Sequence, residues 1–194
     1  MAIGIILLAA GSSFRMGQSK QLLEIGGEQL LLKSTRTALL SKANKVIVVL
    51  GANEVAHRKI IKEMPVDIIV NPDWQYGMGS SIKKGLQELL QIIPQMEAVI
   101  VMVCDQPLLT TDHLNKIIQK FENTQNQIIA SHYSDTAGVP ALFGKSLFEK
   151  LVKVDNETGA KKIIQEHKAI VQTIDFPDGE IDLDTLDDYQ KLVR

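Results

Sequence analysis

The stretch "LLAAGSSFRMGQSKQLL" (residues 7–23) joins the end of an apolar run to a glycine and two cations. The run stops at Gly11, and Arg15 and Lys20 follow shortly after it. Glycine lets a backbone come close to a ligand, and successive backbone N–H groups form an anion-binding concavity. Arginine adds a planar fork of donors and lysine a point charge. The stretch therefore predicts a phosphate-binding loop, in which Arg15 and Lys20 lie along a triphosphate.

Two common phosphate-binding motifs are absent from this stretch. A Walker A loop has four residues between its glycines and then a lysine. Here five residues separate Gly11 from Gly17, and Gln18 stands where that lysine would be. A dinucleotide fingerprint needs Gly-x-Gly-x-x-Gly, which Ala9-Ala10-Gly11 does not supply. The remaining alternative to a phosphate site is a tight strand-to-helix turn with incidental cations.

Apolar runs that alternate with helical patterns predict the fold. Near-continuous runs of Val, Ile and Leu are typical of strands in a parallel sheet that is covered on both faces. We expect strands at residues 3–9, 45–51, 66–71, 98–105, 127–133, 139–144 and 169–175. We expect helices at residues 30–42, 54–64, 80–93, 110–122, 158–167 and 185–193. This order predicts an α/β fold with a Rossmann-like, doubly wound, mostly parallel sheet in three α/β/α layers.

Size and composition limit the classes of protein. The 194 residues predict a single domain, residues 1–194. The net charge of -2 argues against a general nucleic-acid binder, which usually has a basic face. No run is long enough to span a membrane, and the N-terminus lacks the positive start of a signal peptide. The lone Cys104 fits a reducing compartment, so we expect a soluble, cytoplasmic protein.

In an open α/β sheet the ligand lies beyond the carboxyl ends of the strands. Asp105 directly follows an apolar run and is therefore expected to face the phosphate-binding loop. Mg²⁺ prefers one or two carboxylates together with phosphate oxygens, which makes Asp105 a candidate metal ligand. The alternative is that Asp105 caps a turn or a helix.

The remaining polar residues carry weaker signals. Cys104 is expected to be a small buried thiol. His57, His113 and His167 fall in helical patterns, on faces expected to be solvated, and no metal-ligand spacing links them. His132 stands near a strand end, where it either contacts an acceptor phosphate or is simply a satisfied side chain.

The segment "LAAGSSFRMGQSK" (residues 8–20) resembles the N-terminal signature of the MobA-like NTP transferase family. Four further stretches agree in the expected order: "NPDWQYGMGSSIKKGL", "CDQPLL", "GVPALFG" and "DLDTLDDY". The resemblance covers nearly the whole chain and is greatest to the molybdenum cofactor cytidylyltransferase branch. It implies the nucleotidyltransferase fold and a reaction in which a nucleoside triphosphate reacts with a phosphorylated acceptor.

The resemblance also assigns roles to residues. It implies catalytic roles for Arg15, Lys20 and Asp105 and a Mg²⁺ ion on Asp105, with Asp184 as the preferred second ligand and Asp182 as the alternative. Gly138 and Pro140 would lie near the acceptor. The implied nucleotide-binding set is Leu8, Ala9, Ala10, Gly11, Arg15, Lys20, Asn71, Gly77, Ser80, Ser81 and Asp105. Ser80 or Ser81 is also a candidate cap of the helix that follows.

The implied reaction transfers CMP from CTP to the phosphate of a molybdopterin-type cofactor and releases pyrophosphate. Ala10, where guanylyl-transferring relatives usually have glycine, favours CTP over GTP. Alternatives are a GTP donor, a sugar-phosphate or polyol-phosphate acceptor, and a non-catalytic carrier that delivers the cofactor to a molybdenum hydroxylase. Such a hydroxylase is also the partner implied for the enzyme. A redox or regulatory nucleotide-binding domain is a further class, disfavoured by the missing dinucleotide fingerprint.

Overall fold

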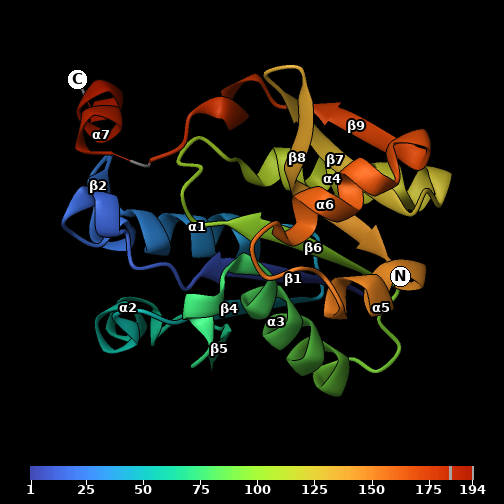
Figure 1. Cartoon of the computed structure of the whole chain (residues 1–194), viewed down its shortest axis with the longest axis horizontal. Coiled ribbons are helices and arrows are strands. Elements are labelled where there is room, and N and C mark those ends of the chain that lie inside the picture. Colours follow the sequence, from blue (N-terminus) through green and yellow to red (C-terminus); the bar gives the residue numbers. More distant parts are fainter. Residues whose placement is uncertain (184, 194) are drawn as a thin grey trace.

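A seven-stranded sheet forms the centre of the molecule (Figure 1). The computed structural model describes residues 1–183 and 185–193. The strand order is β5-β4-β1-β6-β8-β7-β9, and β8 alone among these seven runs antiparallel to its neighbours. The strands are β1 (Ile3–Ala9), β4 (Lys45–Leu50), β5 (Asp67–Val70), β6 (Ala98–Val103), β7 (Ile128–Tyr133), β8 (Thr136–Gly144) and β9 (Val171–Asp175). The prediction of a doubly wound, mostly parallel sheet is confirmed.

Helices cover both faces of this sheet. They are α1 (Leu30–Leu39), α2 (Glu54–Ile61), α3 (Met78–Ile92), α4 (Thr111–Thr124), α5 (Phe148–Val152), α6 (Gly159–Glu166) and α7 (Leu186–Val193). Alternate residues of β1 point to opposite sides, so Ile5 and Leu7 pack with α1, α2 and α4, whereas Ile6 and Leu8 pack with α3, α5 and α6. The central strands β1, β4 and β6 are therefore buried on both faces, which is why their sequences are continuous apolar runs rather than alternations.

Some elements differ from those expected. The short hairpin of β2 (Glu24–Ile25) and β3 (Glu28–Gln29) and the one-turn helix α5 were not predicted, because each is too short to show a hydrophobic period. Helix α3 begins at Met78, two residues earlier than expected. Helix α4 begins as expected, since the Thr110 side chain accepts a hydrogen bond from His113 N.

Helix α7 lies beside the β2–β3 hairpin, far from it in sequence (Figure 1). The Tyr189 hydroxyl donates a hydrogen bond to Glu24 O at 2.9 Å, and Asp188 accepts hydrogen bonds from Thr185 at the start of the helix. Within the described residues, no helix combines the length and the apolar composition needed to cross a membrane.

The chain reverses its direction of winding at β1. Strand β4 pairs with one edge of β1 and β6 with the other, both in parallel. Such a switch point opens a crevice at the carboxyl ends of the strands, because the connections that leave β1 and β6 run toward opposite edges of the sheet. The loops after β1 and β6 therefore border a common cleft.

Candidate active site

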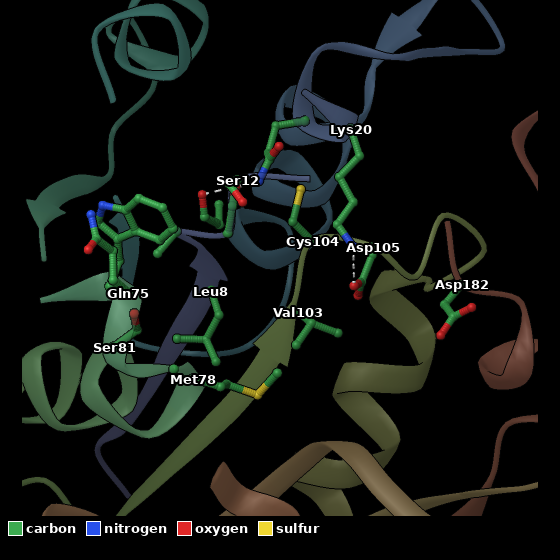
Figure 2. A pocket seen from close by; sticks show the side chains of 16 residues that line it. Leu8, Ser12, Lys20, Gln75, Met78, Ser81, Val103, Cys104, Asp105 and Asp182 are labelled. Atoms are coloured by element: carbon green, nitrogen blue, oxygen red, sulfur yellow. Dashed lines mark hydrogen bonds and ion pairs between the residues drawn. The ribbon is translucent and has the colours of Figure 1, made fainter. Parts of the chain in front are cut away.

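A cleft of about 520 Å³ lies at this switch point (Figure 2). Its lining comes from the loop after β1, the segment that leads into α3, the end of β6 with the residues that follow it, and Asp182, which precedes α7. The lining residues are Leu8, Ala9, Ala10, Gly11, Ser12, Lys20, Gln21, Trp74, Gln75, Gly77, Met78, Ser81, Val103, Cys104, Asp105 and Asp182. The structure thus brings together eight residues of the predicted nucleotide-binding set, namely Leu8, Ala9, Ala10, Gly11, Lys20, Gly77, Ser81 and Asp105.

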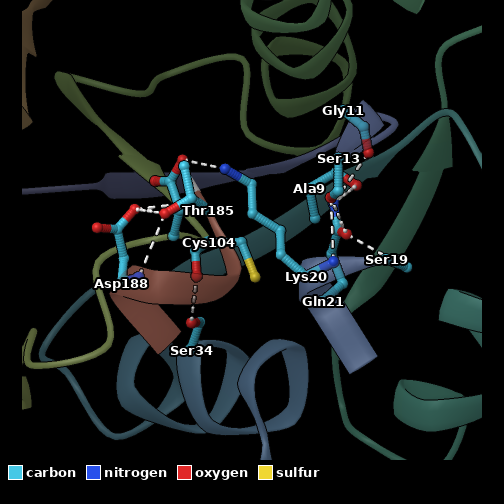
Figure 3. Close-up of polar contacts among 11 residues, drawn as sticks. Ala9, Gly11, Ser13, Ser19, Lys20, Gln21, Ser34, Cys104, Thr185 and Asp188 are labelled. Carbon is cyan, nitrogen blue, oxygen red and sulfur yellow. Dashed lines mark hydrogen bonds and ion pairs between the residues drawn. The ribbon is translucent and has the colours of Figure 1, made fainter. Parts of the chain in front are cut away.

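The loop after β1 is held by one buried glutamine, Gln21 (Figure 3). Its amide Nε2 donates to Ala9 O at 3.3 Å and to Gly11 O at 3.1 Å. Its Oε1 accepts from the hydroxyls of Ser13, at 3.2 Å, and Ser19, at 2.7 Å. Gln21 was not predicted from the sequence. It stands between Lys20 and two leucines, and no local pattern indicates that its side chain is buried.

The carbonyls of three successive residues in this loop all accept hydrogen bonds from the protein. Gln21 binds those of Ala9 and Gly11, and Ala52 N donates to Ala10 O at 2.9 Å. In a trans peptide the N–H points away from the preceding carbonyl. Among the described residues, none accepts a hydrogen bond from the N–H groups of Ala10, Gly11 or Ser12. The loop therefore has three backbone donors available for an anion, as a phosphate-binding loop requires.

The side chains of Lys20 and Asp105 meet across the cleft. Lys20 Nζ lies 2.7 Å from Asp105 Oδ2, and their side chains are 15% and 25% exposed. Lys20 is positioned by Ser13, whose hydroxyl accepts a hydrogen bond from Lys20 N at 3.0 Å. A cation and a carboxylate are thus held together beside the backbone donors.

Arg15 lies in the short 3-10 helix Phe14–Met16, between two residues in the left-handed conformation, Ser13 (φ 55°) and Gly17 (φ 66°). Its side chain lies outside the described part of the chain, so its contact with a triphosphate stays a prediction. This turn brings the chain from the end of β1 back to Lys20.

A second carboxylate, that of Asp182, also lines the cleft (Figure 2). The segment that carries it is fixed next to the first carboxylate, because Leu183 N donates to Asp105 O at 3.1 Å. Asp184, the preferred second metal ligand, lies outside the described residues. Within the described residues no cluster of three or more His, Cys, Asp or Glu could hold a metal. Asp105 and Asp182 both carry carboxylate oxygens, the type of ligand that a hard divalent cation prefers.

The segment that leads into α3 differs from expectation in detail. Gly77 is the N-cap of α3, so neither Ser80 nor Ser81 caps the helix; both lie in its first turn. Ser81 lines the cleft, whereas Ser80 donates to Gly77 O at 2.7 Å and borders a neighbouring hollow. The buried Asn71 Nδ2 donates to the hydroxyls of both serines, at 2.9 and 3.0 Å. Neither Asn71 nor Ser80 lines the cleft, and Asn71 instead holds this segment together.

Glycines allow close approaches around this segment. A Cβ on Gly77, whose φ is 109°, would lie 2.3 Å from Asn156 O, and one on Gly79 would lie 2.4 Å from Asp155 O. A Cβ on Gly51 would lie 2.6 Å from Trp74 Cβ. The structure places Trp74 in the wall of the cleft.

Gly138 and Pro140 lie in β8 and do not line the cleft. A Cβ on Gly138 would lie 2.3 Å from the Tyr133 hydroxyl oxygen. The buried Gln106 Nε2 donates to Val139 O at 3.1 Å, between these two residues, and follows Asp105 in the chain. The strand segment is thus tied to the metal-ligand candidate, and its contact with an acceptor stays a prediction.

Two of the helical histidines are buried, contrary to the expectation of solvated faces. His57 is 0% exposed, and its Nε2 lies 2.6 Å from Ser19 Oγ. His113 stacks on Phe176, with ring centroids 4.5 Å apart, and its Nε2 lies 2.7 Å from Ser131 Oγ. Burial lowers the pKa of His57, and it lowers the pKa of His113 to about 4, with Lys116 acting in the same direction. The apolar environment of both imidazoles favours the neutral form.

Cys104 is buried, as expected. Burial and the neighbouring Asp105 raise the pKa of its thiol to about 12. The thiolate is the nucleophilic form of cysteine, so Cys104 is an inert part of the cleft wall. His132, the other residue with an open role, has Nδ1 3.5 Å from Asp175 Oδ1 on the surface of the sheet.

Comparison with known proteins agrees with this geometry. Residues 5–171 match the family model of the MobA-like NTP transferase domain. Nicotine blue oxidoreductase of Paenarthrobacter nicotinovorans is 28% identical over 200 residues, which cover 97% of this chain and 95% of the relative. Molybdenum cofactor cytidylyltransferase of Escherichia coli is 28% identical over 192 residues, which cover 97% and 94%.

A solved structure has the same fold. The crystal structure of Rv0371c from Mycobacterium tuberculosis is similar to this chain with a TM-score of 0.85 and 26% sequence identity, over 100% of this chain and 98% of that one. The same protein has also been solved in complex with manganese. The predicted nucleotidyltransferase fold is therefore confirmed.

Proposed function

Because this chain belongs to the MobA-like NTP transferase family, we propose that it transfers CMP from CTP to the phosphate of a molybdopterin-type cofactor, with release of pyrophosphate. The observation that carries the proposal is the cleft in which Lys20, Asp105 and three backbone donors lie together. We further propose that residues 1–194 act as one domain, in the cytoplasm.

The residues of the cleft fit the binding of a triphosphate. The N–H groups of Ala10, Gly11 and Ser12 would donate to phosphate oxygens, and the cations of Lys20 and Arg15 would neutralise their charge. The loop is already held in position by Gln21 and Ala52, so the donors need little rearrangement when a nucleotide binds. Such preorganised donors are effective at stabilising charge that develops during transfer.

A divalent cation, which we propose to be Mg²⁺, supplies positive charge at the phosphate oxygens when bound to Asp105 and to Asp182 or Asp184. In the chemical step an oxygen of the acceptor phosphate forms a bond to the α-phosphorus, and the bond from that phosphorus to the bridging oxygen breaks. The electron pair leaves with pyrophosphate. No residue has to act as a base, because a phosphate monoester is already ionised near neutral pH. The chain's own contribution is to position both partners and to stabilise charge.

The identities of the nucleotide base and of the acceptor are proposed mainly from similarity to relatives. The position of Ala10 and the molybdenum cofactor cytidylyltransferase of Escherichia coli support CTP and a molybdopterin-type acceptor. Gly77 and Ser81, at the start of α3, would contact the base or the ribose. A GTP donor, a sugar-phosphate or polyol-phosphate acceptor, and a carrier that serves a molybdenum hydroxylase use the same cleft and are outcomes of the test below.

The test is pyrophosphate release with Mg²⁺ and molybdopterin cofactor, with CTP, GTP, ATP and UTP compared side by side. Release that is greatest with CTP supports the proposal, whereas release that is greatest with GTP overturns the donor assignment. Nucleotide binding without release points to another acceptor, and neither binding nor release points to a carrier. The Mg²⁺ concentration for half-maximal rate, compared in Asp182→Asn and Asp184→Asn, identifies the second ligand.

One relative favours a second candidate function. The alignment with nicotine blue oxidoreductase covers 97% of this chain. Redox chemistry in the same cleft is therefore the alternative function. The pairing of Lys20 with Asp105 favours phosphate chemistry. Titration with NADH and NADPH separates the two: binding of either with an affinity above that for CTP would favour the oxidoreductase.

A further inference from the structure

A chain of three polar side chains links helix α2 to the loop after β1. His57, on α2 and fully buried, has Nε2 2.6 Å from Ser19 Oγ. Ser19 Oγ lies 2.7 Å from Gln21 Oε1, and Gln21 Nε2 contacts the carbonyls of Ala9 and Gly11. Figure 3 shows the Ser19–Gln21 end of this chain beside the loop. A helix outside the cleft is thus connected by hydrogen bonds to the proposed phosphate donors.

The geometry fixes every proton in this chain. Gln21 must direct its Nε2 amide at the two carbonyl oxygens, because the flipped amide would place Oε1 against both of them. Its Oε1 therefore accepts, and Ser19 gives it the single hydroxyl proton. Ser19 Oγ has no second proton, so His57 Nε2–H must be the donor at the other end.

The orientation of this chain determines what His57 does for the loop. A proton on Nε2 leaves Nδ1 as the bare nitrogen of a neutral imidazole, and that atom is buried with no hydrogen-bond partner among the described residues. A hydrocarbon side chain would fill the same space without the cost of burying an unpaired nitrogen. The position of this imidazole is therefore best explained by the one hydrogen bond it donates.

We propose that His57 is a positioning residue for the triphosphate, which acts through Ser19 and Gln21 on the peptide groups that follow β1. Its Nε2–H holds the Ser19 hydroxyl, which holds the Gln21 amide in the orientation that captures Ala9 O and Gly11 O. The N–H groups of Ala10 and Ser12, on the far sides of those peptides, then face away from Gln21 and toward an incoming phosphate. The inference rests on the proposed triphosphate site. It adds that α2, through His57, supports the phosphate-binding loop.

The test measures the affinity for inorganic tripolyphosphate and for CTP, both with Mg²⁺, by calorimetry. Tripolyphosphate has no base or sugar, so its dissociation constant reports on the phosphate loop alone. We expect His57→Leu and Ser19→Ala each to weaken both ligands by about five- to tenfold, the effect of one lost hydrogen bond. The double variant should be little worse than either single one, because both interrupt the same chain.

Two further variants separate positioning from general stability. His57→Gln keeps an N–H donor near the place of Nε2 and should recover most of the affinity for tripolyphosphate. His113→Leu is the matched control, since His113 is also buried and also contacts a serine, Ser131, but lies on α4, away from the loop. Its melting temperature is compared with that of His57→Leu, and its dissociation constant for tripolyphosphate should equal that of the parent.

The outcomes separate this inference from the proposed function. If the parent protein binds neither tripolyphosphate nor CTP, the proposed function fails and this inference fails with it. If the parent binds them and His57→Leu and Ser19→Ala bind equally well, the proposed function stands and the role of His57 is wrong. An equal loss in the His113→Leu control, or no recovery in His57→Gln, shows a general loss of stability and also overturns the inference.

Discussion

Lys20 Nζ lies 2.7 Å from Asp105 Oδ2, although the two residues are 85 positions apart in the chain. Lys20 follows the loop after β1, and Asp105 follows β6, the strand that pairs directly with β1. The parallel pairing of these strands puts their carboxyl ends at one edge of the sheet. This contact is the structural basis of the proposed active site.

Replacing Asp105 by Asn should reduce turnover by about 100-fold or more, because a neutral amide is a poor ligand for Mg²⁺. The side chain is one-quarter exposed, so the fold should tolerate the amide. The measurement is the rate of pyrophosphate release together with the melting temperature. A rate equal to that of the parent in saturating Mg²⁺ would remove Asp105 from the metal site.

Replacing Lys20 by Ala should weaken the binding of CTP by about 10- to 100-fold, which is the usual effect of losing a hydrogen bond to a charged group. Its side chain is only 15% exposed and faces the cleft. Lys116→Ala is the matched control, since Lys116 forms an exposed ion pair with Asp112 on α4. Equal CTP affinity in the two variants would exclude the role of Lys20.

Two glycines should respond in opposite ways to replacement by Ala. A Cβ on Gly11 would meet no atom within 4 Å, so Gly11→Ala should keep the parent's melting temperature. It should still weaken CTP binding, because the methyl group would stand where the phosphates approach the backbone.

Gly79→Ala should instead destabilise the fold, because its Cβ would lie 2.4 Å from Asp155 O. The expected loss of stability is about 1–3 kcal/mol, measured by urea unfolding. A stable Gly79→Ala variant, or a Gly11→Ala variant with full CTP affinity, would contradict these assignments.

The stability of the protein should fall as the pH is lowered from neutral. Burial, reinforced by Lys116 and opposed by Asp112, lowers the pKa of His113 to about 4, against 6.5 when unfolded. Between these values the unfolded chain binds the proton and the folded chain does not, so unfolding becomes more favourable as pH falls. The loss begins near pH 6.5, is complete near pH 4, and amounts to about 3 kcal/mol.

Urea unfolding between pH 4 and pH 7 measures this loss. His113→Gln cannot titrate and should show a shallower dependence on pH. The remaining slope in that variant should include His57, whose pKa is lowered in the same direction by burial. An identical pH dependence in the parent and the variant would show that His113 is not the group responsible.

Much of the fold follows from local patterns in the sequence. The apolar runs that became β1 and β6 are continuous because both faces of those strands are buried, and that is a property of the strand itself. The end of each run then places Gly11 and Asp105 at the carboxyl edge of the sheet. Burial of polar side chains is different, because it depends on elements that are distant in the chain, as His57 and His113 show.

The sequence by itself determined the doubly wound sheet, the loop after β1 with Lys20, and the position of Asp105 after β6, since each follows from hydrophobic runs and the residues at their ends. Only the tertiary structure decided that Gln21 and His57 support the loop, and that Asn71 and Ser80 hold a segment together without entering the cleft. The reason is that a hydrogen bond depends on the distance and orientation of two groups. For these residues, the strand order and the packing of α2 and α3 establish both, and only once the whole sheet is assembled.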